Sequence, residues 1–554
     1  MEMNRRNFLK GAALAGGTAA VVGLAGCSQP GGGTASAADA TGAAITWDEE
    51  YDVVIVGGGG AGLTAAITVA ETDADAQVVI LEKLSSPGGS TIVSGGNIGA
   101  MGTDNLLAFA EETGNDIYKD DSFEMYLEDK LAAGCYYSDP EIARVFCFNS
   151  RDNFNWLESL GIKWNGSRPY EEPVEIPSDF SKSATMQASQ YLMTYNDEGL
   201  SSMINQKIRY NIGSKYKDMS GGGGNFQCLL DTVNTYSNIT IVCDSPVKSI
   251  ARAEPFSGDV QGVVLEDGTA IRAKRAVILA AGGFGGNGEM LHMFDPRIDP
   301  ATKTSGGIGN TGDMIIAAQL VGGQTLNMHC IQIDFGGSAK EPSMSGNVNS
   351  NPFGGAADYI EVGKDGKRFW TEKDSDEQYM DAELQTLHRL GYTSWFKIGD
   401  SQSVAENRTQ ENLDSFSANY GSICQSIEEV AGVVGCDAAT LQETVDRYNS
   451  FIDTQKDTEF GKQKSLLAHK IEAPPFYVFE AAYYCRTTPG GLRINTSAQI
   501  LDLFGQPIPR LFGCGEITGN THGRFRNNGG DSWCDSTCFG RIAGAGAVAT
   551  DPVA

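Results

Sequence analysis

Residues 51–82 read YDVVIVGGGGAGLTAAITVAETDADAQVVILE, and the fold is decided within this stretch. The β-branched apolar run Val53–Val56 is typical of a strand buried on both faces of a parallel sheet. A glycine-rich turn follows, and the sequence then predicts a helix over Leu63–Thr72 and a second strand over Gln77–Leu81. This order, closed by the acidic residue Glu82, predicts an α/β fold with a Rossmann-like unit.

The turn has the spacing G-x-G-x-x-G at Gly57, Gly59 and Gly62. In such turns the first glycine permits a tight bend, the second lets the backbone approach a pyrophosphate, and the third lets the helix pack against the strand. The phosphates then lie at a helix N-terminus, where the helix dipole favours negative charge. Glu82 is placed to meet ribose hydroxyl groups, which a glycine-rich turn without a ligand would not require. We therefore predict a dinucleotide-binding site.

Further small-residue turns indicate that the dinucleotide is FAD rather than NAD. The segments SPGGST at 86–91 and SGGN at 94–97 follow directly and would line an isoalloxazine ring. AGGFG at 281–285 and NGGDS at 528–532 offer more backbone for close approach, and the helix expected over Thr537–Val548 would direct its N-terminus at the flavin pyrimidine. The predicted cofactor-binding residues are Gly57, Gly59, Gly62, Glu82, Lys83, Gly89, Ser90, Gly95, Gly96, Val247, Gly282, Glu516, Gly530 and Ser532.

The first 48 residues are expected to lie outside the fold. NRRNFLK at 4–10, followed by an apolar stretch to Gly26, predicts a twin-arginine export signal over residues 1–27. LAGC at 24–27 resembles the lipobox before a lipidated cysteine, although an ordinary cysteine at Cys27 is the alternative. Residues 28–48 are rich in small residues and predict a flexible linker. We expect an exported protein on the outer face of the cytoplasmic membrane, anchored by lipid at Cys27.

Composition restricts the partners. The formal net charge of −29 argues against binding to nucleic acid or to anionic lipid. A solvated acidic surface explains this charge, and a docking face for a basic redox partner is the alternative.

The twelve cysteines contain no C-x-x-C spacing, so we expect no metal site, and an iron–sulfur cluster stays the alternative. About 500 residues beyond the linker exceed what one core usually holds, which predicts two domains.

These motifs resemble the FAD-dependent flavoprotein family of fumarate reductases and succinate dehydrogenases, which includes ketosteroid dehydrogenases and anaerobic ene-reductases. The resemblance rests on the N-terminal glycine motif with Glu82, on GKRF at 366–369, GGL at 490–492 and GE at 515–516, and on HG at 522–523 leading to a second glycine pair. It implies a discontinuous FAD-binding domain over residues 49–333 and 486–550, with an inserted α+β capping domain over 334–485.

The departures from the family pattern concern the substrate. The resemblance places the histidine, the threonine–glutamate pair and the proton-donating arginine of fumarate reductases on Asp334–Phe335, Asn351–Pro352 and Asp376, respectively. A further substrate histidine falls on Thr487, and only the last substrate arginine is kept, as Arg526. A small dianion would be left without partners in a closed site, where unpaired charge is costly. Fumarate is therefore not expected as the substrate.

The candidate catalytic residues are Arg486, Arg526, Asp376 and Tyr484. Both arginines would polarise a carbonyl or bind one carboxylate. The proton would come from Arg486, Asp376, Tyr484 or Lys373, and an aspartate could supply it only with a raised pKa. For Asp376, which lies in an acidic run, a surface carboxylate is the alternative.

The resemblance implies hydride transfer between flavin N5 and an activated C=C bond. We expect a reductase of an α,β-unsaturated carbonyl compound that is neutral or carries one negative charge, including aromatic and polycyclic compounds. Electrons would come from a separate donor protein, such as a membrane-anchored cytochrome. No histidine occurs between Gly88 and Asn97, where relatives attach their flavin, so FAD should be non-covalent. The alternatives are a flavin dehydrogenase of the 3-ketosteroid type and a lipid-anchored flavoprotein without turnover.

Overall fold

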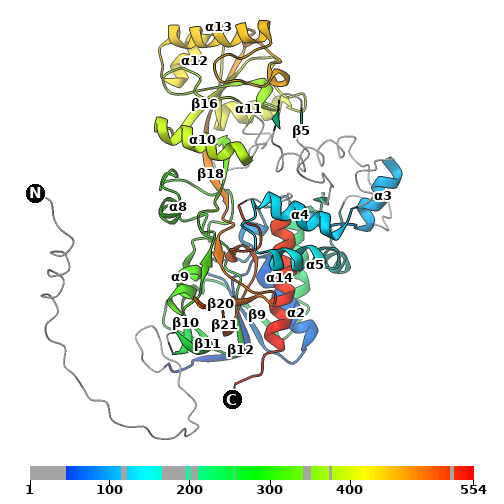
Figure 1. Cartoon of the computed structure of the whole chain (residues 1–554). Helices are drawn as coiled ribbons and strands as arrows, with labels where there is room; N and C mark the ends of the chain where they lie inside the picture. Colours follow the sequence, from blue (N-terminus) through cyan, green and yellow to red (C-terminus); the bar gives the residue numbers. More distant parts are fainter. Residues whose placement is uncertain are drawn as a thin grey trace, which may run out of the picture. The chain divides into compact units, whose positions relative to one another are not determined.

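The computed structural model (Figure 1) describes residues 45–113, 121–164, 195–196, 199–200, 210–211, 213–254, 256–340, 351–372, 377–524 and 530–553. The predicted signal and most of the predicted linker lie outside the described residues, as do Lys373, Asp376 and Arg526. Among the residues that are described, no helix is both long and apolar enough to cross a membrane.

The N-terminal stretch forms the centre of an eight-stranded sheet. Its middle strands are parallel and run in the order β12-β1-β2-β9, and β21 extends the parallel part beside β12. The residues Val53, Val54 and Ile55 of β1 are fully buried, as their apolar run predicts. The strands of this sheet are β1 (Glu49–Val56), β2 (Val78–Leu81), β9 (Ile239–Val242), β10 (Val247–Glu254), β11 (Ser257–Leu265), β12 (Ala270–Leu279), β20 (Gln499–Leu501) and β21 (Pro507–Gly513).

Two helices far apart in the sequence pack closely on this sheet. They are α2 (Gly60–Thr72) and α14 (Asp531–Val548), which lie side by side in Figure 1. A Cβ atom at Gly540 or Gly544 would lie 2.8 Å from the carbonyl oxygen of Ala61 or 2.6 Å from that of Ala65, respectively. The glycines of α14 therefore allow the two helix backbones to approach. The described helix begins at Asp531, six residues before the predicted start at Thr537.

Two predicted elements differ from the structure. The sequence predicts a helix over Asn225–Tyr236 after the tetraglycine at 221–224. In the structure this helix is α7 (Gly221–Val233), which contains the whole tetraglycine in its first turn and ends three residues before Tyr236. A Cβ at Gly222 would lie 2.0 Å from the carbonyl oxygen of Thr91, so close packing explains the glycine there. The alternating pattern of residues 240–253 predicts one strand. The structure divides this run into β9 and β10, because the chain turns at Asp244, which has a φ of +52°.

A second sheet has the strand order β14-β18-β16-β15, with β17 also paired to β18. Its strands are β14 (Gln332–Ser338), β15 (Ile360–Val362), β16 (Ser394–Gly399), β17 (Gly421–Cys424) and β18 (Phe476–Thr487). The helices α10 (Glu377–Leu390), α11 (Gln410–Asn419), α12 (Ile427–Val434) and α13 (Ala438–Thr454) accompany it, and a separate apolar core lies between this sheet, α12 and α13. The predicted cap falls on this region, but β14 and β18 each extend two residues past its boundaries at 334 and 485. The division into two domains stays a prediction.

The remaining α-helices of the described residues come, in chain order, between β2 and β9 or between β12 and β20. They are α3 (Asp104–Thr113), α4 (Phe123–Ala133), α5 (Pro140–Ser159), α8 (Gly288–Phe294) and α9 (Asp313–Leu320). The amphipathic run predicted over 138–160 is α5, which begins with the capping residue Asp139 and has a proline in its first turn.

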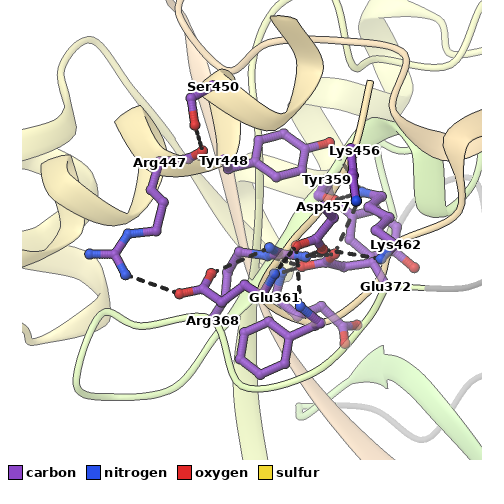
Figure 2. Close-up of polar contacts among 12 residues, drawn as sticks. Tyr359, Glu361, Arg368, Glu372, Arg447, Tyr448, Ser450, Lys456, Asp457 and Lys462 are labelled. Carbon is purple, nitrogen blue, oxygen red and sulfur yellow. Dashed lines mark hydrogen bonds and ion pairs between the residues drawn. The ribbon is translucent and has the colours of Figure 1, made fainter. Parts of the chain in front are cut away.

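Buried charges surround the GKRF turn of the second sheet region (Figure 2). Arg368 donates to both carboxylate oxygens of Glu372 at 2.9 and 2.6 Å, and to Asp457 at 3.0 Å. Lys462 donates to the Tyr448 hydroxyl at 3.1 Å, and its Nζ lies 3.7 Å from Glu372. Burial alone would raise the pKa of Glu372, but Lys462 and Arg368 hold that pKa below its ordinary value. The network fixes the chain immediately before residue 373.

We expect Arg368→Met to lower the free energy of unfolding by about 3–5 kcal/mol, because two buried carboxylates lose their cation. Arg447→Met is the matched control, since Arg447 pairs with Glu443 at 2.6 Å while its side chain is 50% exposed. The free energy of unfolding of Arg447→Met should fall by less than about 1 kcal/mol. Urea denaturation of both variants measures the difference, and equal losses would contradict the assigned role of the buried network.

Candidate functional site

Three glycines shape the turn between β1 and α2, each for a different reason. Gly57 has a φ of +111°, and a Cβ there would lie 2.4 Å from the carbonyl oxygen of Ala280. A Cβ at Gly62 would lie 2.0 Å from the carbonyl oxygen of Gly57. Gly59 precedes the first residue of α2, and its Cβ would meet only the carbonyl oxygen of Gly88, at 3.9 Å. The first and third glycines thus permit close packing, whereas the second keeps a surface open at the helix N-terminus.

Glu82 is held in place at the end of β2. Its side chain is buried, with one carboxylate oxygen accepting from the Gly58 amide at 2.9 Å and the other from the Leu84 amide at 2.9 Å. Each carboxylate oxygen keeps a second lone pair for a ligand hydroxyl.

A cleft of about 780 Å³, including space open to solvent, lies at the C-terminal ends of β1, β2 and β12. We call it the first cavity. It is lined by many of the residues predicted to bind the cofactor, namely Gly57, Gly59, Glu82, Lys83, Gly89, Ser90, Val247, Gly282 and Glu516.

The other predicted glycines support the first cavity without lining it. Gly62 packs under the turn, and Gly530 (φ +101°) precedes α14 against Asn97. Gly96 (φ +71°) lies against α7, and its carbonyl oxygen accepts from the Asn225 side chain at 2.8 Å. Gly95 lies beside it in the chain and is likewise not on the cavity wall.

Sequence reasoning missed a segment that completes the first cavity. Asn310 lines it and donates through its side-chain amide to Ser90 Oγ at 3.0 Å and to Glu516 at 3.3 Å. Lys83 donates to Thr311 at 2.7 Å and to Asp313 at 3.0 Å. The run GGIGNTGD at 306–313 was a signal that could have identified this segment, because its glycines resemble those of the other turns.

A second cavity, of about 300 Å³ including space open to solvent, shares Glu516 with the first. The first turns of α14 border both cavities, since Ser532 and Asp535 line the second and Ser536 lines the first. Glu516 accepts from the Thr487 hydroxyl and the Thr488 amide, each at 2.8 Å. The second cavity is lined by Gln332, Thr487, Thr488, Pro489, Glu516, Thr518, His522, Ser532 and Asp535.

The two cavities fit FAD. An open helix N-terminus at Gly59 suits a pyrophosphate, and the carboxylate of Glu82 suits a ribose. The second cavity has buried polar atoms that are poorly satisfied in the described part of the chain: Oδ1 of Asp535 has no hydrogen-bond partner there, and Nε2 of His522 has only a long contact with Oδ2 of the same carboxylate. Such atoms suit the polar edge of a flavin ring. No cluster of three or more metal-ligating side chains occurs among the described residues.

Two candidate catalytic residues lie together on β18. Arg486 donates to Asp334 at 3.3 Å, and Tyr484 lies opposite Asp334 in the register of β14 and β18. Tyr484 is 2% exposed, and burial raises the pKa of its hydroxyl, with a further contribution from the nearby Asp334. Neither Arg486 nor Tyr484 lines a cavity described above, although the adjacent Thr487 lines the second.

Comparison with known proteins identifies this arrangement. Residues 52–531 match the family model described as FAD binding domain, and residues 2–22 match the TAT (twin-arginine translocation) pathway signal sequence. The second match confirms the predicted export by the twin-arginine route, whereas the lipid at Cys27 stays a prediction.

Two curated relatives come from Eggerthella lenta. The chain is 31% identical to a urocanate reductase over 511 residues, covering 90% of this chain and 75% of that protein. It is 29% identical to a digoxin reductase over 594 residues, covering 99% and 98%, respectively. The solved structure of the open conformation of a flavocytochrome c3 fumarate reductase is 25% identical with a TM-score of 0.71, covering 91% of this chain and 79% of that one.

These matches confirm the α/β fold, the resemblance and FAD as the cofactor. The chain therefore belongs to the FAD-binding domain family, as an FAD-dependent oxidoreductase that acts on carbon–carbon double bonds.

Proposed function

We propose that this exported flavoprotein reduces the C=C bond of an α,β-unsaturated carbonyl compound that is neutral or carries a single carboxylate. Bound FAD supplies hydride transfer to one carbon of that bond. The residues of the first cavity would hold the dinucleotide without a covalent bond, and Glu516, Thr487 and the other residues of the second cavity would hold its flavin ring.

The pairing of Arg486 with Asp334 is the observation that supports this substrate class. Asp334 is buried, and its carboxylate lies 3.3 Å from the guanidinium of Arg486. An arginine whose charge is compensated within the chain suits a polar carbonyl or one carboxylate better than a dianion.

Asp334 gives Arg486 a fixed orientation, from which the guanidinium polarises the substrate carbonyl. Tyr484 is protonated near neutral pH, as tyrosines ordinarily are, and burial raises the pKa of its hydroxyl further. It therefore acts as a hydrogen-bond donor beside Arg486. The proton for the second carbon comes from Arg486, from Tyr484, or from Lys373 or Asp376 in the segment that follows Glu372.

We also propose that the mature protein is held by lipid at Cys27 on the outer face of the cytoplasmic membrane, with residues 28–48 as a linker. Its electrons come from a separate electron-transfer protein, such as a membrane-anchored cytochrome. The acidic composition suits a basic surface on that partner.

Turnover tests the substrate class directly. The purified FAD-loaded protein should oxidise reduced viologen under anaerobic conditions with a neutral enone or a monoacid such as acrylate or urocanate. Digoxin belongs in the same panel, because a relative is named for it. We expect kcat/KM for fumarate to be lower by about 100-fold or more, since unpaired charge costs several kcal/mol. Fumarate as the fastest acceptor would overturn the proposal.

Removing the charge of Asp334 tests the role of its pairing. In Asp334→Asn, Arg486 loses its carboxylate partner, so inhibition by small carboxylates should strengthen by about tenfold and kcat/KM for neutral acceptors should fall. Asp73→Asn is a matched control, because Asp73 pairs with Arg275 at 3.1 Å at the far end of α2. Unchanged carboxylate inhibition in Asp334→Asn would show that Arg486 does not face the substrate.

Two glycine substitutions separate cofactor binding from folding. Gly59→Val adds a side chain on the open surface, so FAD affinity should fall by about 10- to 100-fold while the thermal unfolding of the apoprotein is nearly unchanged. Gly62→Ala places a Cβ 2.0 Å from a carbonyl oxygen and should lower the stability of the apoprotein by about 1–3 kcal/mol. FAD titration and calorimetry measure the two effects, and wild-type FAD affinity in Gly59→Val would contradict the assigned pyrophosphate position.

A further inference from the structure

Four buried ionisable side chains form a cluster beside the second cavity. Lys130 comes from α4, His522 from the segment after β21, and Asp531 and Asp535 from the first two turns of α14. Their exposed fractions are 1%, 8%, 0% and 2%, respectively. Burying a lysine and two carboxylates is costly unless their charges are compensated, so the cluster requires an explanation.

Lys130 fixes the proton of the His522 ring. Nζ of Lys130 lies 3.2 Å from Nδ1 of His522 and 3.6 Å from a carboxylate oxygen of Asp531. An ammonium group can only donate, so Nδ1 must accept and carries no proton. Burial lowers the pKa of His522 and the charge of Lys130 lowers it further, and together they outweigh Asp535 and Asp531, which raise it. The ring is therefore neutral near pH 7, with its single proton on Nε2.

His522 lies on the wall of the second cavity. Nε2 of His522 lies 3.6 Å from Oδ2 of Asp535, and both residues line the cavity together with Ser532. Oδ1 of Asp535 has no hydrogen-bond partner among the described residues, and Nε2 of His522 has only the long contact with Oδ2 of the same carboxylate. A buried donor with only this long contact is poorly satisfied, so a better acceptor is expected on the ligand that fills the cavity.

We propose that His522, fixed by Lys130 in its Nε2-protonated form, donates a hydrogen bond to a pyrimidine oxygen of the flavin and so raises the midpoint potential of the bound cofactor. This inference rests on the proposed function, because it requires FAD with its ring in the second cavity. His522 is the residue that touches the cofactor, and Lys130 is a positioning residue.

The direction of each effect follows from the charge that reduction places on the pyrimidine part of the ring. A hydrogen-bond donor, the positive charge of Lys130 and the N-terminus of α14 stabilise that charge and favour the reduced form. Asp535 and Asp531 oppose this stabilisation, because their carboxylates bring negative charge near the pyrimidine part of the ring. Substitutions at these positions should therefore shift the potential in opposite directions.

The midpoint potential of the substrate-free holoenzyme tests the proposal, measured by anaerobic reduction against a reference dye. In His522→Leu, the ratio of reduced to oxidised flavin at a fixed potential should fall by about tenfold, as expected for a lost hydrogen bond to a developing charge. His522→Gln should restore most of the ratio, because its amide keeps a donor near the position of Nε2. Lys130→Met should lower the ratio, and Asp535→Asn should raise it.

Lys397→Met is the matched control, because Lys397 is also a buried lysine and lies 3.6 Å from Glu361 in the second sheet region. The midpoint potential of the flavin in Lys397→Met should equal that of the wild type. Nitrogen-15 NMR of the wild type should show His522 as the neutral Nε2-protonated form, and Lys130→Met should redistribute the proton between the two ring nitrogens. If Lys130→Met fails to fold, the comparison of His522→Leu with His522→Gln still decides.

The outcomes separate the inference from the function on which it rests. A holoenzyme that binds FAD but has an unchanged potential in His522→Leu would overturn this inference alone, even if KM for the substrate changed. A purified protein that binds no FAD would overturn the proposed function and this inference together.

Discussion

The structure depends on the close approach of three backbones at one turn. Where β1 ends, Gly57 lies so near Ala280 that a Cβ would be 2.4 Å from the carbonyl oxygen, and Gly62 brings the first turn of α2 onto the same place. This contact aligns the ends of β1 and β12 and exposes the helix N-terminus between them. The glycines of α14 then let that helix pack against α2, which places its first turns beside both cavities.

Charge compensation has the same importance in the second sheet region. Arg368 is surrounded by the carboxylates of Glu372 and Asp457, and Arg486 is paired with Asp334. In both cases a buried or half-buried arginine is bound by the protein itself. The first pairing stabilises the fold, whereas the second leaves a site with a compensated charge, which is why we favour a substrate that is not a dianion.

The sequence predicted those parts of the fold that local chemistry determines. The β-branched run of β1, the glycine spacing and Glu82 are expected together in a dinucleotide-binding unit. The strand–turn–helix unit and FAD could therefore be inferred from the sequence. The division of β9 from β10 could not, because it depends on a left-handed residue at Asp244 in an otherwise alternating run. The start of α7 was missed by four residues because glycine is a poor helix former; Gly222 packs against Thr91, Gly224 packs against Met219, and Gly221 has a φ of +66°.

The site was predictable to a similar extent. Residues inside glycine motifs, such as Ser90 and Glu516, lie on the wall of the first cavity. Pairs that are distant in the chain could not be found from spacing, since Lys130 and His522 are 392 positions apart and Arg486 and Asp334 are 152 apart. Asn310 was missed although its surroundings are glycine-rich, because no known motif assigned that run to the cofactor.

The central claim is that the two cavities joined at Glu516 hold one FAD molecule. A crystal structure of the FAD-loaded protein tests it most directly. The account predicts electron density for the pyrophosphate at Gly59, for a ribose at Glu82, and for the flavin ring in the second cavity with a pyrimidine oxygen within hydrogen-bond distance of Nε2 of His522. A flavin ring outside the second cavity, or a pyrophosphate away from the N-terminus of α2, would contradict it.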